Sequence, residues 1–261
     1  MSKARDREEE LLRMEIKDKV DTVRYYWSKK GLTDIFDILE HQAIIIRKPK
    51  LTSNVDDLFS GFTTYIDDHF IVYINTAHTL GRQRFTAAHE LYHLEYDRDL
   101  LTKEKATTEK ELKTNDKYAD RFATEFLMPE DAVNEYVLRE LADTTIQPEH
   151  VVRMMYYFKV SYRAMVNRLF SLGYIDTNQA DALKSISSKE NAGVLSTLVK
   201  SQGLEPTLIT KTQESSISKK YLHYLFDNYR NKKIAYGRVK STLEYIGRTP
   251  EEYGIYPPDE T

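Results

Sequence analysis

The 261-residue chain contains no cysteine. This absence excludes disulfide bonds and thiolate metal ligands, so a metal ion would have to be bound by histidine, aspartate or glutamate. It also suits a reducing compartment. The chain carries no large excess of one charge, because its formal net charge is −3. No global attraction to nucleic acid or to an anionic membrane is therefore implied.

Long apolar runs are also lacking, so no segment is expected to span a bilayer. Residues 1–20 are charged throughout and lack the apolar core of a secretory signal. We therefore expect a cytoplasmic protein. Hydrophobic residues make up 41% of the chain and charged residues 30%, which is typical of a folded domain and not of a disordered one. The length predicts one large unit or two smaller ones.

Hydrophobic periodicity predicts an α+β protein. Residues 4–29 and 35–41 have helical spacing, and β-rich segments follow at 43–46, 59–66 and 70–74. Asp67-Asp68 suits a turn between the last two, so we expect a small antiparallel sheet. The remaining chain is predicted to be mostly helical. Its expected helices lie at 83–96, 115–127, 130–141, 148–157 and 161–172, with more up to residue 247.

Residues 85–96 read FTAAHELYHLEY and contain an H-E-x-x-H pattern. Positions i and i+4 share one face of a helix, so His89 and His93 can bind one ion. Glu90 can take a proton from a metal-bound water, whose pKa the ion lowers toward neutrality. This pattern is typical of a zinc hydrolase, most often a peptidase. The alternative is an ordinary packed helix that happens to carry two histidines.

A catalytic zinc ion needs a third protein ligand and one open position. On the helix expected at 115–127, Asp116 and Asp120 share the side of the small residues Ala119 and Ala123. We expect Asp116 to bind the metal and Asp120 to hold the free N–H of a ligating histidine. Alternatively, Asp116 is a helix-start carboxylate that follows an N-cap at Asn115. Other residues that could supply the third ligand are Glu109, Glu111, His69 and His78.

Three separated motifs together resemble the ImmA/IrrE family of metallopeptidases. They are RQRFTAAHELYH at 82–93, ADRFATEFLMP at 119–129, and FKVS at 158–161 with the residues that follow it to 173. The resemblance covers roughly residues 30–175. Two positions depart from the family pattern, because Tyr92 stands where the family has glycine and Asp116 where it has glutamate. Tyr92 would fill space beside the site, and the shorter arm of Asp116 demands a closer helix.

The resemblance implies a zincin-like fold, with the H-E-x-x-H helix and a second ligand-bearing helix packed on the sheet. It implies a zinc endopeptidase, with manganese as the alternative ion. The implied protein substrate is a helix-turn-helix (XRE-type) repressor, whose cleavage relieves repression of a stress regulon or a mobile element. The second hypothesis is an inactive peptidase fold that captures a repressor or DNA without cleaving it.

The helical remainder contains two further features. Residues 151–173 resemble a helix-turn-helix with Ser161 as an N-cap, which we interpret as a packing module in preference to a DNA-contacting one. Residues 219–240 are basic around a single acid, Asp227. They are a candidate contact for substrate or nucleic acid, although a solvated helix face or an acidic partner would also explain them. The candidate contact residues are Lys219, Lys220, Arg230, Lys232 and Lys233.

The predicted organisation has three parts. Residues 1–129 would form the zincin-like domain with its N-terminal helix, 130–175 the helix-turn-helix-like module, and 176–261 a helical region for substrate, sensor or partner binding. A protein substrate is the expected partner, DNA is less favoured, and no membrane is expected. The sequence does not indicate an oligomeric state.

Overall fold

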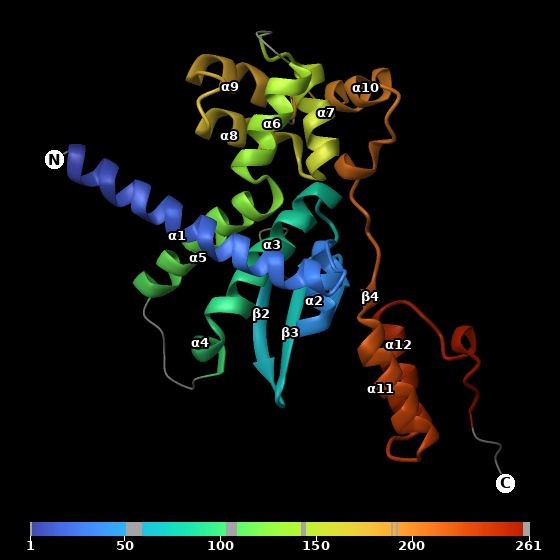
Figure 1. The fold of residues 1–261 in the computed structure, drawn as a ribbon. Helices are drawn as coiled ribbons and strands as arrows, with labels where there is room; N and C mark the ends of the chain where they lie inside the picture. The colour runs from blue at the N-terminus through green and yellow to red at the C-terminus, as the bar shows by residue number, and fades with distance from the viewer. Residues whose placement is uncertain are drawn as a thin grey trace.

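The computed structural model describes residues 2–50, 59–102, 109–141, 145–188, 190–191 and 193–257. It confirms the α+β class (Figure 1). The first part contains α1 (Ser2–Lys29), α2 (Ile35–Gln42), β1 (Ile44–Lys48), β2 (Gly61–Ile66), β3 (His69–Asn75), α3 (Leu80–Tyr96), α4 (Arg98–Thr102) and α5 (Glu109–Leu127). The rest contains α6 (Glu130–Glu140), α7 (Pro148–Phe158), α8 (Tyr162–Ser171), α9 (Thr177–Ser185), α10 (Val194–Ser201), η1 (Pro206–Ile209), β4 (Ser216–Ile217), α11 (Lys219–Arg230), α12 (Tyr236–Tyr245) and η2 (Glu251–Tyr253).

The sheet is mixed, with the strand order β2-β3-β1-β4. β2 and β3 form the expected antiparallel hairpin, and both turn residues, Asp67 and Asp68, have positive φ as a type I′ turn requires. β1 pairs with β3 in parallel, so the prediction of an antiparallel sheet is wrong for this pair. Alternating apolar residues locate a strand but do not say which neighbour it joins or in which direction. The two-residue β4, which extends the sheet beside β1, was not predicted.

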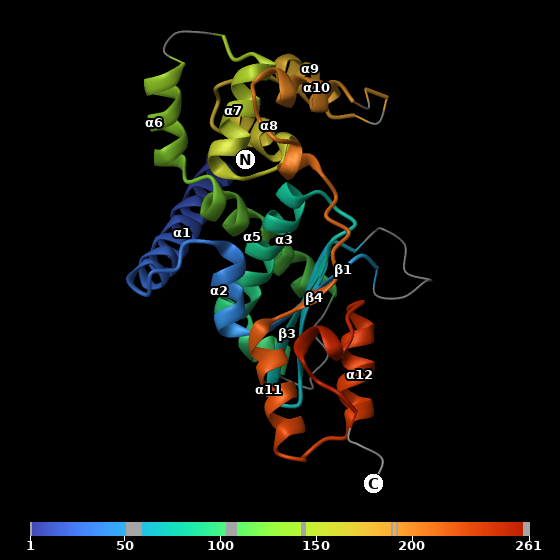
Figure 2. The ribbon, with the colours of Figure 1, turned by 90° about the vertical axis from the view of Figure 1, so that its right-hand side faces the viewer.

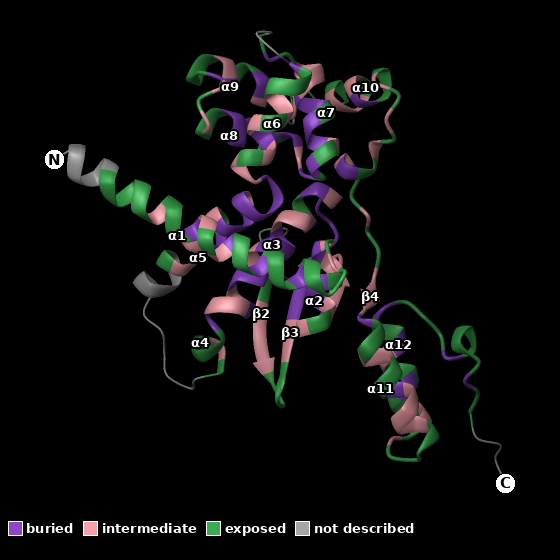
Figure 3. Cartoon of the chain, in the orientation of Figure 1, coloured by how far each residue is buried: buried purple, intermediate pink, exposed green. Residues whose placement is uncertain are grey.

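One hydrophobic core runs from α1 to η1 (Figure 3). α1 contributes four side chains spaced three or four residues apart, and it crosses α5, whose predicted inward residues are all buried, as expected. α3 lies between α5 and the sheet, where its contacts with both are extensive. The buried residues of α1 are Ile16, Val20, Val23 and Trp27, and those of α5 are Ala119, Phe122, Ala123 and Phe126.

The first turn of α3 is pressed against the turn that joins α7 to α8. A Cβ atom on Gly81 would lie 2.7 Å from the backbone nitrogen of Ser161, so only glycine permits this approach. Ser161 caps α8 as predicted, because its Oγ accepts a hydrogen bond from the N–H of Ala164 at 3.2 Å. The helix-turn-helix-like pair is therefore docked on the helix that carries the H-E-x-x-H pattern.

Residues 206–217, which we call the connecting segment, return from α10 along the start of α3 to the sheet (Figure 2). Leu80 N–H donates to the carbonyl of Thr210 at 3.1 Å, and the amide of Gln83 donates to Thr212 Oγ1 at 3.1 Å. Gln213 N–H donates to the carbonyl of Thr76, also at 3.1 Å. Hydrogen bonds to the connecting segment thus hold the start of α3 in place.

Helices α11 and α12 form a hairpin with a core of its own, built on Leu225, Val239 and Leu243. The amino group of Lys48 joins this hairpin to the sheet by donating to the carbonyl of Tyr245 at 2.8 Å. Among the described residues, no helix is both long and apolar enough to cross a membrane. The division of the chain at 129 and 175 stays a prediction.

Candidate active site

His89 and His93 lie one turn apart on α3, and their Nε2 atoms are 3.2 Å from each other. The Nδ1–H of His89 donates to Asp120 at 2.9 Å, and the Nδ1–H of His93 donates to Asp97 at 2.7 Å. These bonds place the ring proton on Nδ1, so each Nε2 carries a lone pair. Two lone pairs that face each other repel unless a proton or a cation lies between them. The pair is thus arranged to share a proton or to bind a cation.

Asp116 completes the cluster from α5. Its Oδ1 lies 4.0 Å from Nε2 of His89 and 3.8 Å from Nε2 of His93. Within the described residues these three side chains form a group that could hold a metal ion. Donors about 2.0–2.2 Å from a tetrahedral ion stand about 3.4 Å apart. The histidine pair meets this spacing, and the exposed carboxylate of Asp116 would need to approach by about 0.5 Å. The donor set therefore fits zinc.

The structure also shows where the alternative N-cap and the alternative metal ligands lie. α5 begins at Glu109, so Asn115 is inside the helix and is not an N-cap. His69 is exposed at the β2–β3 turn, where its Nδ1 meets the carbonyl of Asp67 at 2.6 Å. His78 is buried and is not part of the cluster described above. The side chains of Glu109 and Glu111 lie outside the described part of the chain.

Glu90 belongs to α3 and is 4% exposed, and its carboxylate lies against β2. The hydroxyl of Thr63 donates to Oε2 of Glu90 at 2.7 Å, which fixes the carboxylate beside the edge of the sheet. Burial raises the pKa of Glu90, although the nearby histidines and the Thr63 bond act in the opposite direction. A carboxylate with a raised pKa accepts a proton more readily at neutral pH.

The acids around His89 favour its charged form. Burial lowers the pKa of His89, but the hydrogen bond that His89 donates to Asp120 and the charges of Glu90 and Asp116 outweigh it, so the pKa of His89 is raised overall. Protons and a metal ion therefore compete for this side chain in the range where histidine titrates.

Asp97 is a site residue that the sequence analysis missed. It is the C-cap of α3 and only 8% exposed. Its position four residues after His93 is the same i,i+4 spacing that identified the histidine pair, so the signal was present. It was overlooked because the expected helix ended at residue 96, and the residue after a helix was interpreted as loop.

Tyr92 fills space in the core beside the site. Its ring packs 5.3 Å from that of Tyr96 and 5.6 Å from that of Phe122, and it meets the His93 ring edge at 5.8 Å. It is 4% exposed, and it supports α3 against α1 and α5. Burial raises the pKa of its hydroxyl well above the ordinary value.

The basic residues of the C-terminal hairpin lie at the two ends of α11, and their contact with substrate or nucleic acid stays a prediction. Lys219 and Lys220 open α11, whereas Arg230, Lys232 and Lys233 lie at its other end, about 16 Å away along the axis. The predicted basic patch is thus two separate groups.

An H-E-x-x-H helix, a carboxylate from a second helix and a buried glutamate beside a sheet edge define a metallopeptidase type of site. The model of the IrrE N-terminal-like peptidase domain matches residues 39–170, just over half of the chain. The chain belongs to the ImmA/IrrE family of metallopeptidases. No curated protein matches it. The family implies a bound metal ion, for which His89, His93 and Asp116 are the candidate ligands.

Proposed function

We propose that the protein is a zinc-dependent endopeptidase. The observation that carries the proposal is the pair of Nε2 lone pairs at 3.2 Å, with the Asp116 carboxylate 3.8–4.0 Å away and Glu90 beside them. A zinc ion held by these three side chains would act as a Lewis acid and lower the pKa of a bound water. The family match supports this reaction class.

The protein's own residues perform the proton transfers. Glu90 accepts a proton from the attacking water and later gives it to the leaving amine nitrogen, as its raised pKa favours. Asp120 and Asp97 keep His89 and His93 in one tautomer and one orientation. The substrate backbone would add to β2, which is the strand at the open edge of the sheet. β3, the strand directly before α3, has a neighbouring strand on each side and offers no free edge.

We further propose that the substrate is a helix-turn-helix repressor in the same cytoplasm, and that its cleavage relieves repression of a stress regulon or a mobile element. The support for this substrate is the family resemblance. The test is to mix the purified protein and zinc or manganese with candidate repressors from its own genome. A cut repressor band would support the substrate assignment, and intact repressors under conditions that cleave other polypeptides would contradict it.

The Glu90→Gln variant tests the mechanism. The amide retains the size of the side chain and can still accept the Thr63 hydrogen bond, but it cannot take the proton. We expect unchanged zinc content and folding, and loss of cleavage. Full activity in this variant would refute the role of Glu90.

The alternative is a peptidase fold that captures its partner without hydrolysis, and the exposed Asp116 with its 3.8–4.0 Å gap to the histidines is the observation that favours it. Metal analysis separates the two. Stoichiometric zinc that is lost on His93→Ala supports the enzyme. Absence of metal in protein purified without chelator supports the binding protein.

A further inference from the structure

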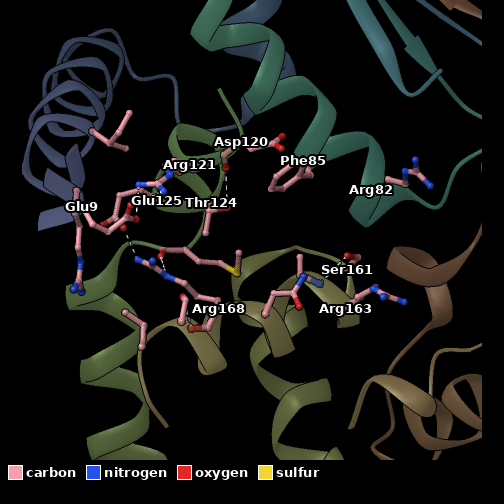
Figure 4. Close-up of a pocket in the computed structure, with 17 residues that line it drawn as sticks. Glu9, Arg82, Phe85, Asp120, Arg121, Thr124, Glu125, Ser161, Arg163 and Arg168 are labelled. Atoms are coloured by element: carbon pink, nitrogen blue, oxygen red, sulfur yellow. Dashed lines mark hydrogen bonds and ion pairs between the residues drawn. The ribbon is translucent and has the colours of Figure 1, made fainter. Parts of the chain in front are cut away.

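A cavity of about 720 Å³ opens beside the site, between α3 and α8, with α1 and α5 at its far end (Figure 4). This volume is within the range of pockets that bind small molecules. Asp120, which holds His89, also borders the cavity, so the cavity and the histidine site share a wall. Its apolar lining includes Phe85, Met128 and Leu172.

Not every arginine that borders the cavity pairs with an acidic side chain of the described residues. Arg121 is paired with Glu9, and the buried Arg168 is paired with Glu125. Arg163 has no hydrogen bond or ion pair with any described residue, and Arg82 donates only to the neutral Oγ of Ser60, at 2.8 Å. Two exposed guanidinium groups therefore border the cavity without an acid partner in the described part of the chain.

These two arginines lie at one end of the cavity. Gly81 is in tight contact with Ser161, and Arg82 and Arg163 follow them by one and two residues. Figure 4 shows both side chains at the end opposite Glu9. A carboxylate held between two guanidinium groups makes charge-assisted hydrogen bonds, which are among the strongest in proteins.

The cavity is in line with the histidine site along α3. Arg82, Phe85 and His89 repeat at intervals of three and four residues, so they share one face of the helix. Arg82 precedes His89 by about 10 Å along the helix axis. An extended peptide advances about 3.3 Å per residue, so about three residues separate the two positions.

The exposed stripe of α8 also faces this cavity. Arg163, Asn167 and Ser171 repeat every four residues, and all three line it. The second helix of the helix-turn-helix-like pair therefore turns its free polar face toward the peptidase site.

We propose that this cavity binds the substrate polypeptide on one side of the cleaved bond, with an apolar side chain against Phe85 and Met128 and an acidic side chain on Arg82 and Arg163. The acidic residue stands about three positions from the cleaved bond. This inference rests on the proposed peptidase function, since it assigns the substrate preference of the same site.

The test uses the full chain loaded with zinc and randomised dodecapeptides in which Asp, Asn or Lys is fixed at each position in turn. Mass spectrometry of the products gives the cleaved bond and the preferred neighbours. We expect Asp about three positions from the cleaved bond to raise kcat/KM at least tenfold over Asn. Arg163→Glu should abolish this preference and favour Lys at the same position. Arg153→Glu, an equal charge change on the exposed face of α7 and outside the cavity, should leave the preference unchanged.

The outcomes separate this inference from the proposed function. If the protein cleaves peptides but Arg163→Glu keeps the acidic preference, the inference is overturned and the peptidase function stands. If nothing is cleaved, the peptidase function fails in this assay, and binding of the same peptides to Glu90→Gln decides the role of the cavity. Acid-selective binding that is lost on Arg163→Glu would support it. Binding without acid preference, or binding of inorganic phosphate alone, would overturn it.

Discussion

Replacing Gly61 with alanine should damage the site without touching its ligands. Gly61 begins β2, and a Cβ atom there would lie 2.6 Å from the carbonyl oxygen of Tyr73 and 2.5 Å from Cγ2 of Thr86. Because ordinary contacts are 3.4–4 Å, the edge strand would have to retreat by roughly 0.8 Å. The same retreat would lengthen the 2.7 Å bond between Thr63 and Glu90 to about 3.5 Å, at which little of it remains.

The expected cost is about 1–3 kcal/mol of unfolding free energy, which is typical of overpacking. For a chain of this size it corresponds to a fall in Tm of about 2–10 °C. We also expect kcat/KM to fall about tenfold at a temperature where the variant is fully folded, because Glu90 loses its fixed position. Thermal unfolding and cleavage of a fluorogenic peptide measure the two effects.

Gly237→Ala on α12 is the matched control. No atom lies within 4 Å of its added Cβ, and its φ is not positive. Alanine there should stabilise the protein by about 0.5–1 kcal/mol through helix propensity and leave cleavage unchanged. A Gly61→Ala variant with wild-type Tm and activity would refute the argument that β2 is held against α3 by this close approach.

Three further predictions concern the metal site. Asp97→Asn should weaken zinc binding about 10- to 100-fold in a chelator competition, because His93 loses its charged hydrogen-bond partner; unchanged affinity would contradict this. Asp116→Glu adds about 1.5 Å of reach to a carboxylate that is 3.8–4.0 Å from the histidine nitrogens, so zinc affinity should rise several-fold, and weaker binding would show that the shorter arm is the better fit. In metal-free protein the raised pKa of Glu90 means that the folded state binds the proton more tightly than the unfolded state. Stability is therefore lost as the pH rises from about 4.5 through the folded pKa. Glu90→Gln should consequently be the more stable protein in urea denaturation at pH 7.5, with a smaller difference at pH 4; an equal difference at both pH values would argue against the raised pKa.

The helices could be predicted closely from local patterns. Apolar spacing placed the cores of α3 and α5, and the cap at Ser161 was predicted from a single residue type. α5 begins six residues before its expected start, because the charged segment from Glu109 gave no apolar signal although it continues the helix. Helical geometry depends on neighbours in the chain, which is why these elements could be read from the sequence.

The contacts between distant segments could not be predicted in this way. The parallel pairing of β1 with β3 and the two-residue β4 depend on where the chain crosses the sheet. In the site, the i,i+4 spacing predicted the histidine pair. Asp116 and Asp120 were predicted because they share one side of their helix with the small residues Ala119 and Ala123. Thr63 was missed because it comes from a strand, and only the packing of β2 on α3 brings its hydroxyl to Glu90.

The connecting segment has a consequence for the order of events during synthesis of the protein. Gln83, in the first turns of α3, is bonded to Thr212, which lies 129 positions later in the chain. At translation rates of about 5–20 residues per second, roughly 6–26 s pass between the synthesis of the two residues. During this interval α3, which carries both histidines, lacks its hydrogen bond to Thr212. The first turns of the helix that carries the histidine pair therefore reach their final contacts only after residue 212 has been made.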